Sequence, residues 1–298
     1  MKTAFLFAGQ GQQFLNMGQD LADKHPQVKE MYQKAEAILG YDLLHLDESK
    51  LHETQYTQPA LLTLNCAIAL LLKGVSKDYV AGLSLGEYAA LTESSVLSFE
   101  DALKLVAQRA LIMNSAFSPN ETGMVAVLKC DYETLSTLLK GTGVEICNYN
   151  TPDQIVIGGR SEDLDKTVAM LKENGVRRCI PLKVSSVSHM SLLTDASQEL
   201  ETVLKQFTFK KPSITFINNV DARVQESGFE DTLKRQISQM TRLSETIQYL
   251  IDQGVQRFIE IGPKGALSKC VLAHDKSLSV VNIYDDETLV EFLGGYNA

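Results

Sequence analysis

The chain has 298 residues, of which 44% are hydrophobic and 22% are charged, a composition typical of a folded globular protein rather than a disordered one. Its 28 basic and 37 acidic side chains give a formal net charge of −9. Such a chain would repel a phosphate backbone, so we expect no nucleic-acid partner, and its length predicts roughly two domains.

The N-terminal part of the chain alternates between predicted strands and helices. Residues 3–8 form an apolar run that is too short for a signal peptide and is followed by the polar sequence GQGQQ, so we predict a buried strand. Residues 26–39 have helical periodicity and end at Gly40, a residue that commonly closes a helix. The longest apolar segment, 59–72, is interrupted by Thr63 and Asn65 and falls short of the ~20 residues of a membrane span. We therefore predict a buried helix here and no membrane association.

A strand, a tight turn and two helices are predicted next. Residues 78–82 read as a short strand that continues directly into a glycine-flanked turn and a helix over 87–92. Ser98, followed by Phe-Glu-Asp, resembles a capping box and predicts a second helix that extends to about Asn114.

The pattern changes after Pro119. Strands are predicted over 124–130, 144–150, 154–158 and 176–184, with helices over 132–140 and 162–174. The resulting order, βαββαβ, is the ferredoxin-like pattern, and the segment is long enough for a small domain.

Strand and helix alternate again after His189. We predict helices over 193–206, 231–253 and 265–272, and strands over 213–218 and 257–261. Alternation on both sides of the insert indicates an α/β domain with a parallel sheet, interrupted by a small α+β domain. We expect the large domain to comprise residues 1–122 and 190–298, and the small domain residues 123–189.

The first candidate for chemistry is Ser84, in the sequence Gly82-Leu-Ser84-Leu-Gly86 between a predicted strand and a predicted helix. This is the G-x-S-x-G pattern of a nucleophile elbow, in which the glycines permit a sharp turn and the helix N-terminus directs a backbone N–H at an oxyanion. The alternative is a turn rich in serine and glycine that only packs.

A serine nucleophile needs a base, and His189 is the best-placed histidine. His25, His45, His52 and His274 lie among charged, polar or proline neighbours, whereas His189 ends an apolar run where the insert rejoins the large domain. Binding sites commonly lie at such domain junctions. The alternative is a buried histidine with a structural role.

Arg109 departs from the polar stripe of its predicted helix. Lys104 and Gln108 lie on one face, and Arg109 projects about 100° away among Leu105, Val106 and Met113. Either its side chain extends to solvent, or it is a buried guanidinium that can hold a carboxylate with two hydrogen bonds.

Two further patterns limit the chemistry. The turn Gly9-Gln-Gly-Gln-Gln13 is not GxGxxG, so dinucleotide binding is poorly supported, although glutamines flanked by glycine suit a donor to an oxyanion. The five cysteines are scattered and include no CxxC pair or zinc spacing, which predicts buried thiols in a reducing cytoplasm and neither disulfides nor a metal. We expect no cofactor.

Taken together, these segments resemble the malonyl-CoA:acyl carrier protein transacylase family over nearly the whole chain. The resemblance is carried by GQGQQ at 9–13, GLSLGEYAAL at 82–91, Arg109, NYNTPDQIVIGG at 148–159, PLKVSSVSH at 181–189, INN at 217–219 and FIEIGP at 258–263.

The resemblance implies an α/β-hydrolase-like large domain with a ferredoxin-like insert, and a ping-pong transfer of malonyl from malonyl-CoA to acyl carrier protein in fatty acid biosynthesis. It makes Ser84 the nucleophile and His189 the base, with Gln10 and Leu85 as the oxyanion hole. Arg109 would bind the malonyl carboxylate. The family orients its histidine through a backbone carbonyl, for which the matching position is Arg242.

The chain departs from the family pattern at four places. Leu83 stands where many relatives have histidine, and Gly262-Pro-Lys-Gly265 reorders a common GPGK. Met240, Thr241 and Leu243 surround Arg242 where relatives often have Pro-Val and an aromatic residue. Ser188 replaces a phenylalanine and should open the acyl pocket, as in polyketide acyltransferases that select methylmalonyl.

Three other functions remain as alternatives: an acyltransferase that serves a polyketide synthase, a serine acyl hydrolase, and an inactive module that binds a carrier protein. Arg109 argues against the hydrolase, since ester hydrolases seldom need a buried cation. Carrier proteins are acidic, so docking to this acidic chain, which we expect to be a monomer, requires a basic patch. The candidates are Lys172, Arg177, Arg178 and Lys183, with Lys205, Lys210 and Lys211, which are close in sequence to the end of a helix; the alternative is an ordinary solvated face.

Overall fold

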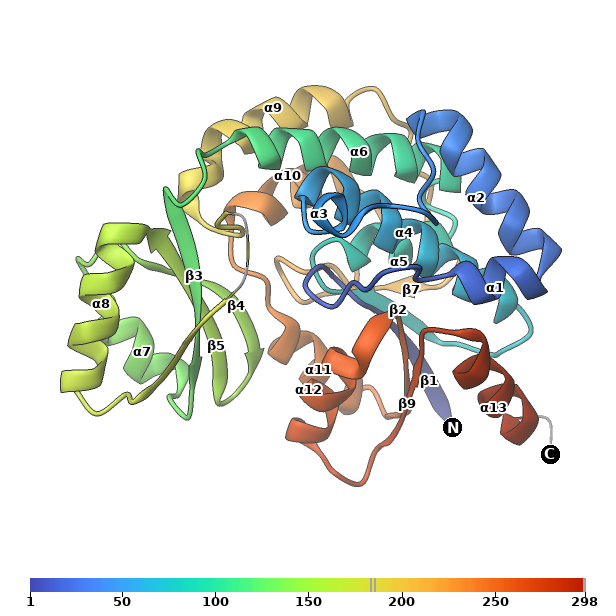
Figure 1. The fold of residues 1–298 in the computed structure, drawn as a ribbon. Helices are drawn as coiled ribbons and strands as arrows, with labels where there is room; N and C mark the ends of the chain where they lie inside the picture. The colour runs from blue at the N-terminus through green and yellow to red at the C-terminus, as the bar shows by residue number, and fades with distance from the viewer. Residues whose placement is uncertain (183, 185, 297–298) are drawn as a thin grey trace.

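The computed structural model describes residues 1–182, 184 and 186–296, and these residues form two sheets with different topologies (Figure 1). The large sheet is parallel, in the order β7-β2-β1-β8-β9. Its strands are β1 (Lys2–Phe7), β2 (Tyr79–Gly82), β7 (Thr215–Phe216), β8 (Val255–Ile261) and β9 (Ser279–Ile283).

Helices cover both faces of the large sheet, as expected for a parallel sheet. Alternate residues of β1 point to opposite faces: Ala4 and Leu6 pack with α11 (Leu243–Asp252) and α12 (Ala266–His274), whereas Phe5 and Phe7 pack in the larger core. The helices that contribute to the larger core include α2 (Pro26–Leu39), α4 (Thr54–Leu71), α5 (Gly86–Glu93), α6 (Phe99–Ser115), α9 (Thr194–Leu204), α10 (Phe229–Ser238) and α13 (Asp286–Tyr296). Short helices α1 (Gln19–Lys24) and α3 (Glu48–Leu51) complete this side.

The small sheet is antiparallel, in the order β4-β5-β3-β6. Its elements follow the predicted order: β3 (Thr122–Leu128), α7 (Tyr132–Leu138), β4 (Glu145–Thr151), β5 (Gln154–Arg160), α8 (Ser161–Glu173) and β6 (Arg178–Pro181). The strand order matches a ferredoxin-like sheet, which confirms the predicted fold class. In Figure 1 this unit, drawn in green, stands to one side of the large sheet. We propose the division into residues 1–122 with 190–298 and 123–189, which the two separate sheets support.

The small sheet presents its second face to the segment that carries His189. Val125 and Val127 of β3 pack with the core under α7 and α8, whereas Met124 and Ala126 pack with Val187 and Met190. Val187, two residues before His189, and Met190, directly after it, are therefore held by apolar contacts with the small sheet.

Several local expectations are met by the structure. Helix α2 has the predicted bounds, with Pro26 in its first turn and Gly40 in the left-handed conformation after its end, and Ser98 caps α6 by accepting a hydrogen bond from the N–H of Asp101. None of the helices among the described residues is both long and apolar enough to cross a membrane.

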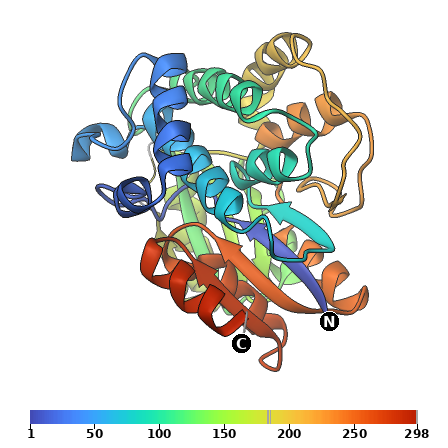
Figure 2. The same cartoon turned by 90° about the vertical axis from the view of Figure 1, so that its right-hand side faces the viewer.

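The predicted helix over 231–253 is wrong. The structure has two helices there, α10 and α11, because Thr241 lies alongside β4: its N–H donates to the Cys147 carbonyl at 3.0 Å, and its carbonyl accepts from the Tyr149 N–H at 2.9 Å. Figure 2 shows the molecule from the side, with the helices arranged around the large sheet.

Candidate active site

Ser84 lies in a sharp turn between β2 and α5, and the turn depends on its two glycines. A Cβ atom at Gly82 would overlap the backbone of Gly86, and one at Gly86 would overlap the carbonyl oxygen of Phe7. Ser84 itself has a φ of 53°, a left-handed conformation that is uncommon for a residue other than glycine. The sequence therefore forms a strained elbow that presents a half-buried hydroxyl above the sheet.

His189 meets this hydroxyl although the two residues are 105 positions apart: its Nε2 lies 2.8 Å from Ser84 Oγ. Its Nδ1 lies 2.6 Å from the backbone carbonyl oxygen of Gln236. Because a carbonyl can only accept, Nδ1 carries the hydrogen and Nε2 is left to accept the serine proton. The imidazole is thus held in the tautomer that general-base chemistry requires.

The expectation that the backbone carbonyl belongs to Arg242 is wrong. Arg242 lies beyond the end of α10, where its guanidinium pairs with Glu245 at 2.9 Å and its N–H donates to the Asn219 carbonyl at 2.9 Å. Instead, the last turn of α10 lies against His189: the His189 N–H donates to the Ile237 carbonyl at 2.9 Å, and the carbonyl that reaches its ring is that of Gln236.

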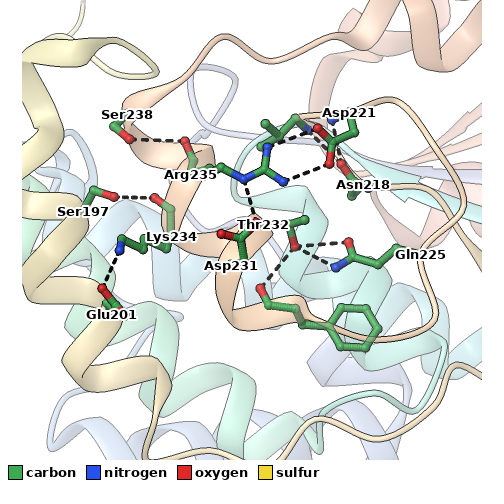
Figure 3. Close-up of polar contacts among 12 residues, drawn as sticks. Ser197, Glu201, Asn218, Asp221, Gln225, Asp231, Thr232, Lys234, Arg235 and Ser238 are labelled. Carbon is green, nitrogen blue, oxygen red and sulfur yellow. Dashed lines mark hydrogen bonds and ion pairs between the residues drawn. The ribbon is translucent and has the colours of Figure 1, made fainter.

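Contacts on both sides of α10 hold the two residues that precede Gln236, Lys234 and Arg235 (Figure 3). Arg235 forms two hydrogen bonds with Asp221, at 3.1 and 3.0 Å, and one with Asp231 at 2.8 Å. On the opposite side, Ser197 of α9 donates to the carbonyl of Lys234 at 2.7 Å. Gln236 therefore follows two residues that are tied to different neighbouring elements.

The site keeps His189 neutral. Burial, together with the nearby positive charge of Arg109, lowers the pKa of His189 to about 4, although the hydrogen bond to the Gln236 carbonyl opposes this shift. A base with a pKa below its ordinary value is unprotonated at neutral pH, so His189 is ready to accept the Ser84 proton.

We expect the His189 imidazole to titrate near pH 4, well below an ordinary histidine. Heteronuclear NMR on protein with labelled histidine measures this directly, with free histidine in the same buffer as the reference. Loss of the signal in His189→Gln assigns it. A midpoint for His189 equal to that of free histidine would contradict the buried, neutral base.

Arg109 is buried beside the serine, with 1% of its surface exposed. Its Nη1 donates to Gln58 Oε1 at 2.6 Å, and its Nη2 donates to Gln236 Oε1 at 2.9 Å and to Ser84 Oγ at 3.2 Å. The guanidinium carbon lies 5.4 Å from the centre of the Tyr88 ring. No carboxylate among the described residues forms an ion pair with it, so its charge is held by neutral acceptors and can attract a bound carboxylate.

The two residues expected to form the oxyanion hole lie near the elbow. Leu85 occupies the N-terminus of α5, where the first N–H groups have no partner within the helix. A Cβ atom at Gly9 would come within 2.5 Å of the Leu83 carbonyl oxygen, so the turn that carries Gln10 lies directly against the elbow. The Gln10 side chain donates to Thr54 Oγ1 at 3.1 Å, which leaves the backbone N–H as the group relevant to an oxyanion.

Four polar residues of the site were given no role from the sequence: Gln58, Glu87, Asn219 and Gln236. Gln58 is a polar residue at the start of an apolar run, and Glu87 is an acid within a helix that is otherwise almost wholly buried. Polar side chains in such buried positions need hydrogen-bond partners. The presence of polar residues among apolar ones was therefore the sequence signal that could have indicated a role for Gln58 and Glu87. The motifs GLSLGEYAAL and INN contain Glu87 and Asn219, but no spacing rule indicates that these residues meet.

Known proteins match this chain both in sequence and in structure. Residues 4–290 match the family model of the acyl transferase domain. The chain is 37% identical over 301 residues to the malonyl CoA-acyl carrier protein transacylase of Bacillus subtilis (strain 168), covering 97% of this chain and 95% of that protein. The crystal structure of MCAT from Streptococcus pneumoniae is 43% identical, with a TM-score of 0.95 over 99% of this chain and 100% of that one. A malonyl-transacylase in complex with a type II PKS acyl-carrier protein is 32% identical, with a TM-score of 0.94 over 99% and 100%.

Proposed function

Because this chain belongs to the acyl transferase domain family, we propose that it transfers a malonyl group from malonyl-CoA to the thiol of an acyl carrier protein. One observation carries the proposal: Ser84 Oγ contacts both the neutral base His189, at 2.8 Å, and the buried cation Arg109, at 3.2 Å. A nucleophile beside a base suits acyl transfer. A cation with neutral partners next to that nucleophile suits an acyl group that ends in a carboxylate.

The first half-reaction forms an ester on Ser84. His189 Nε2 takes the hydroxyl proton as Oγ attacks the thioester carbonyl, and the resulting oxyanion is stabilised by the N–H groups of Gln10 and Leu85. When the oxyanion collapses, the carbon–sulfur bond breaks, and the sulfur of CoA takes the proton from His189. The Gln236 carbonyl stabilises the imidazolium that exists between these two transfers.

The second half-reaction reverses the first with a different thiol. His189 takes the proton of the carrier's phosphopantetheine thiol, the sulfur attacks the Ser84 ester, and Ser84 leaves with the proton. Arg109 holds the malonyl carboxylate throughout, which discriminates against neutral acyl groups, since these would leave a buried guanidinium without its partner.

The pathway that the product enters depends on the carrier. We propose fatty acid biosynthesis, which the family resemblance implies. The likeness to a malonyl-transacylase that is bound to a polyketide carrier favours a polyketide carrier as the second candidate. Ser188, which is half-buried with its Oγ 3.6 Å from Met124 Sδ, leaves more room beside His189 than phenylalanine would and favours acceptance of methylmalonyl. All five cysteines are free thiols, which suits the reducing cytoplasm where we propose that the enzyme acts.

We propose that the carrier docks on a basic patch formed by Lys172, Arg177 and Arg178, which are all exposed. Lys172 lies in the last turn of α8, and Arg178 begins β6, the edge strand from which the chain leads to His189. Lys183, the fourth residue expected in the patch, lies outside the described residues. In a chain with a net charge of −9, a local positive region is required to attract an acidic partner.

The test separates the two half-reactions. Wild-type protein incubated with malonyl-CoA and holo acyl carrier protein should produce malonyl-carrier, detected by intact mass spectrometry of the carrier. Changing Lys172, Arg177 and Arg178 together to glutamate should slow transfer to the carrier about tenfold or more, while loading of Ser84 from malonyl-CoA remains unchanged. Release of free malonate without malonyl-carrier would instead identify a hydrolase, and unchanged transfer in the triple variant would exclude the patch.

A further inference from the structure

Glu87 is a buried acid that the proposed mechanism does not use. It lies in the first turn of α5, three residues after Ser84, with 1% of its surface exposed. Its Oε1 accepts a hydrogen bond from the backbone N–H of Asn219 at 3.0 Å, and its Oε2 accepts one from Nε2 of Gln236. Neither partner carries a charge, so Glu87 is not half of a buried ion pair.

The first partner, Asn219, holds the nucleophile elbow. Its side-chain Oδ1 accepts the N–H of Ser84 at 2.6 Å, and its Nδ2 donates to the carbonyl of Gly82. One amide thus fixes the backbone on both sides of Leu83. Glu87 holds the backbone of Asn219 and so sets the position of this clamp.

The second partner, Gln236, contacts Arg109, His189 and Ser84. Its Nε2 also donates to the carbonyl of Ser84 at 2.9 Å, its Oε1 accepts from Arg109 at 2.9 Å, and its backbone carbonyl accepts from His189 at 2.6 Å. The orientation of its side-chain amide therefore decides whether Arg109 faces an acceptor or a donor.

Glu87 determines that orientation. An ionised carboxylate and the Ser84 carbonyl can only accept, so the amide nitrogen of Gln236 must face them and its oxygen must face Arg109. With the amide reversed, Nε2 would meet the N–H groups of the guanidinium. Two acceptors on one side of Gln236 make the correct orientation the only one that satisfies all of its neighbours.

We propose that Glu87 is a positioning residue, which acts through Gln236 and Asn219 to hold Arg109 and the Ser84 elbow in the geometry for malonyl transfer. This inference rests on the proposed function. An acid is costly at this position: burial raises the pKa of Glu87 to about 7, against the lowering effects of the Asn219 and Gln236 hydrogen bonds and of the Arg109 charge. A side chain that only filled space there would be less costly if it were neutral.

Glu87→Gln and Glu87→Asp separate positioning from packing. Glutamine preserves the shape but brings a donor to a place where two donors already converge, which opposes the present orientation of Gln236 and leaves only the Ser84 carbonyl and Arg109 to favour it. Aspartate keeps the acceptor chemistry but is shorter by one methylene. A positioning role therefore predicts that malonyl selectivity decreases in the order Glu, Asp, Gln, whereas a packing role predicts the order Glu, Gln, Asp.

The measurement is the initial rate of Ser84 acylation from malonyl-CoA and from acetyl-CoA, at a mildly alkaline pH where Glu87 is ionised. We expect Glu87→Gln to lower the ratio of malonyl to acetyl rates about tenfold or more, and Glu87→Asp to lower it less. The matched control is Glu260→Gln. Glu260 is also buried, with 1% of its surface exposed, and accepts hydrogen bonds from the N–H groups of Leu267 and Ser268 at the start of α12. Its variant should lose thermal stability without a change in the ratio.

An unchanged ratio in Glu87→Gln, or a larger loss in Glu87→Asp than in Glu87→Gln, would overturn the proposal. If Glu87→Gln does not fold, the wild-type ratio measured on either side of the Glu87 pKa of about 7 still decides, because protonation removes the acceptor without changing the packing. A lower ratio at the acidic pH supports positioning, and the same ratio at both pH values refutes it. A wild-type protein that forms no malonyl ester would instead refute the proposed function, so the two failures are distinguishable.

Discussion

Ser84→Ala should abolish the malonyl adduct that the wild-type protein forms with malonyl-CoA. Without the hydroxyl there is no atom to carry the ester, and His189 has no proton to accept. The overall rate should fall by a factor on the order of 10⁶, as for other enzymes that lose a serine nucleophile. Intact mass spectrometry of the protein after incubation with malonyl-CoA measures the adduct.

Ser94→Ala is the matched control. Ser94 is buried at the end of α5, where its hydroxyl donates to the Ala90 carbonyl at 2.8 Å. It has no role in the proposed mechanism. This variant should still form the adduct. A covalent malonyl group on Ser84→Ala would assign the nucleophile to another residue, whereas its absence from both variants would point to damage to the fold rather than to chemistry.

Arg109→Ala should separate malonyl from neutral acyl groups. The change removes a charge-assisted contact with a carboxylate in a buried site, which costs about 2–5 kcal/mol, so malonyl loading should fall a hundredfold or more. Acetyl loading should be maintained or rise, because a desolvated cation no longer opposes a neutral chain. Arg109→Lys should restore malonyl loading only in part, since an ammonium group cannot hold both carboxylate oxygens in one plane.

The decisive quantity is the ratio of malonyl to acetyl loading rates in each variant. Arg160→Ala is a suitable control, since Arg160 is an exposed arginine that pairs with Glu121 at 2.6 Å in the small sheet. Its ratio should equal that of the wild type. Equal losses of both rates in Arg109→Ala would make Arg109 structural and would remove the physical basis for a carboxylated substrate.

The sequence predicted local elements best where their signals lie within the element itself. Pro26 and Gly40 bound α2, and Ser98 caps α6, so both helices could be read directly. The strand and helix order of the insert was confirmed for the same reason. The break between α10 and α11 could not be read, because it arises from the pairing of Thr241 with β4, almost a hundred residues earlier.

The residues of the candidate site also differ in whether a sequence pattern can reveal them. A serine in an elbow, an arginine off its polar stripe and a histidine at a domain junction all have side chains that a pattern can reveal. The carbonyl that meets His189 is a backbone atom, which every residue possesses, so its assignment to Arg242 had no chemical signal to test it. The Glu87, Asn219 and Gln236 network requires three segments to meet, and only the tertiary structure brings them together.

The position of β1 at the centre of the large sheet has a consequence for how the protein emerges from the ribosome. All strands of the small sheet lie within residues 122–181, so this unit has its partners available early in synthesis. Strand β1 pairs with β2 on one side, but its other edge waits for β8, which begins at Val255. One edge of an apolar strand thus remains open for most of translation, a state prone to aggregation. We therefore expect the nascent chain to need chaperones more than a domain whose strands pair with near neighbours in the sequence.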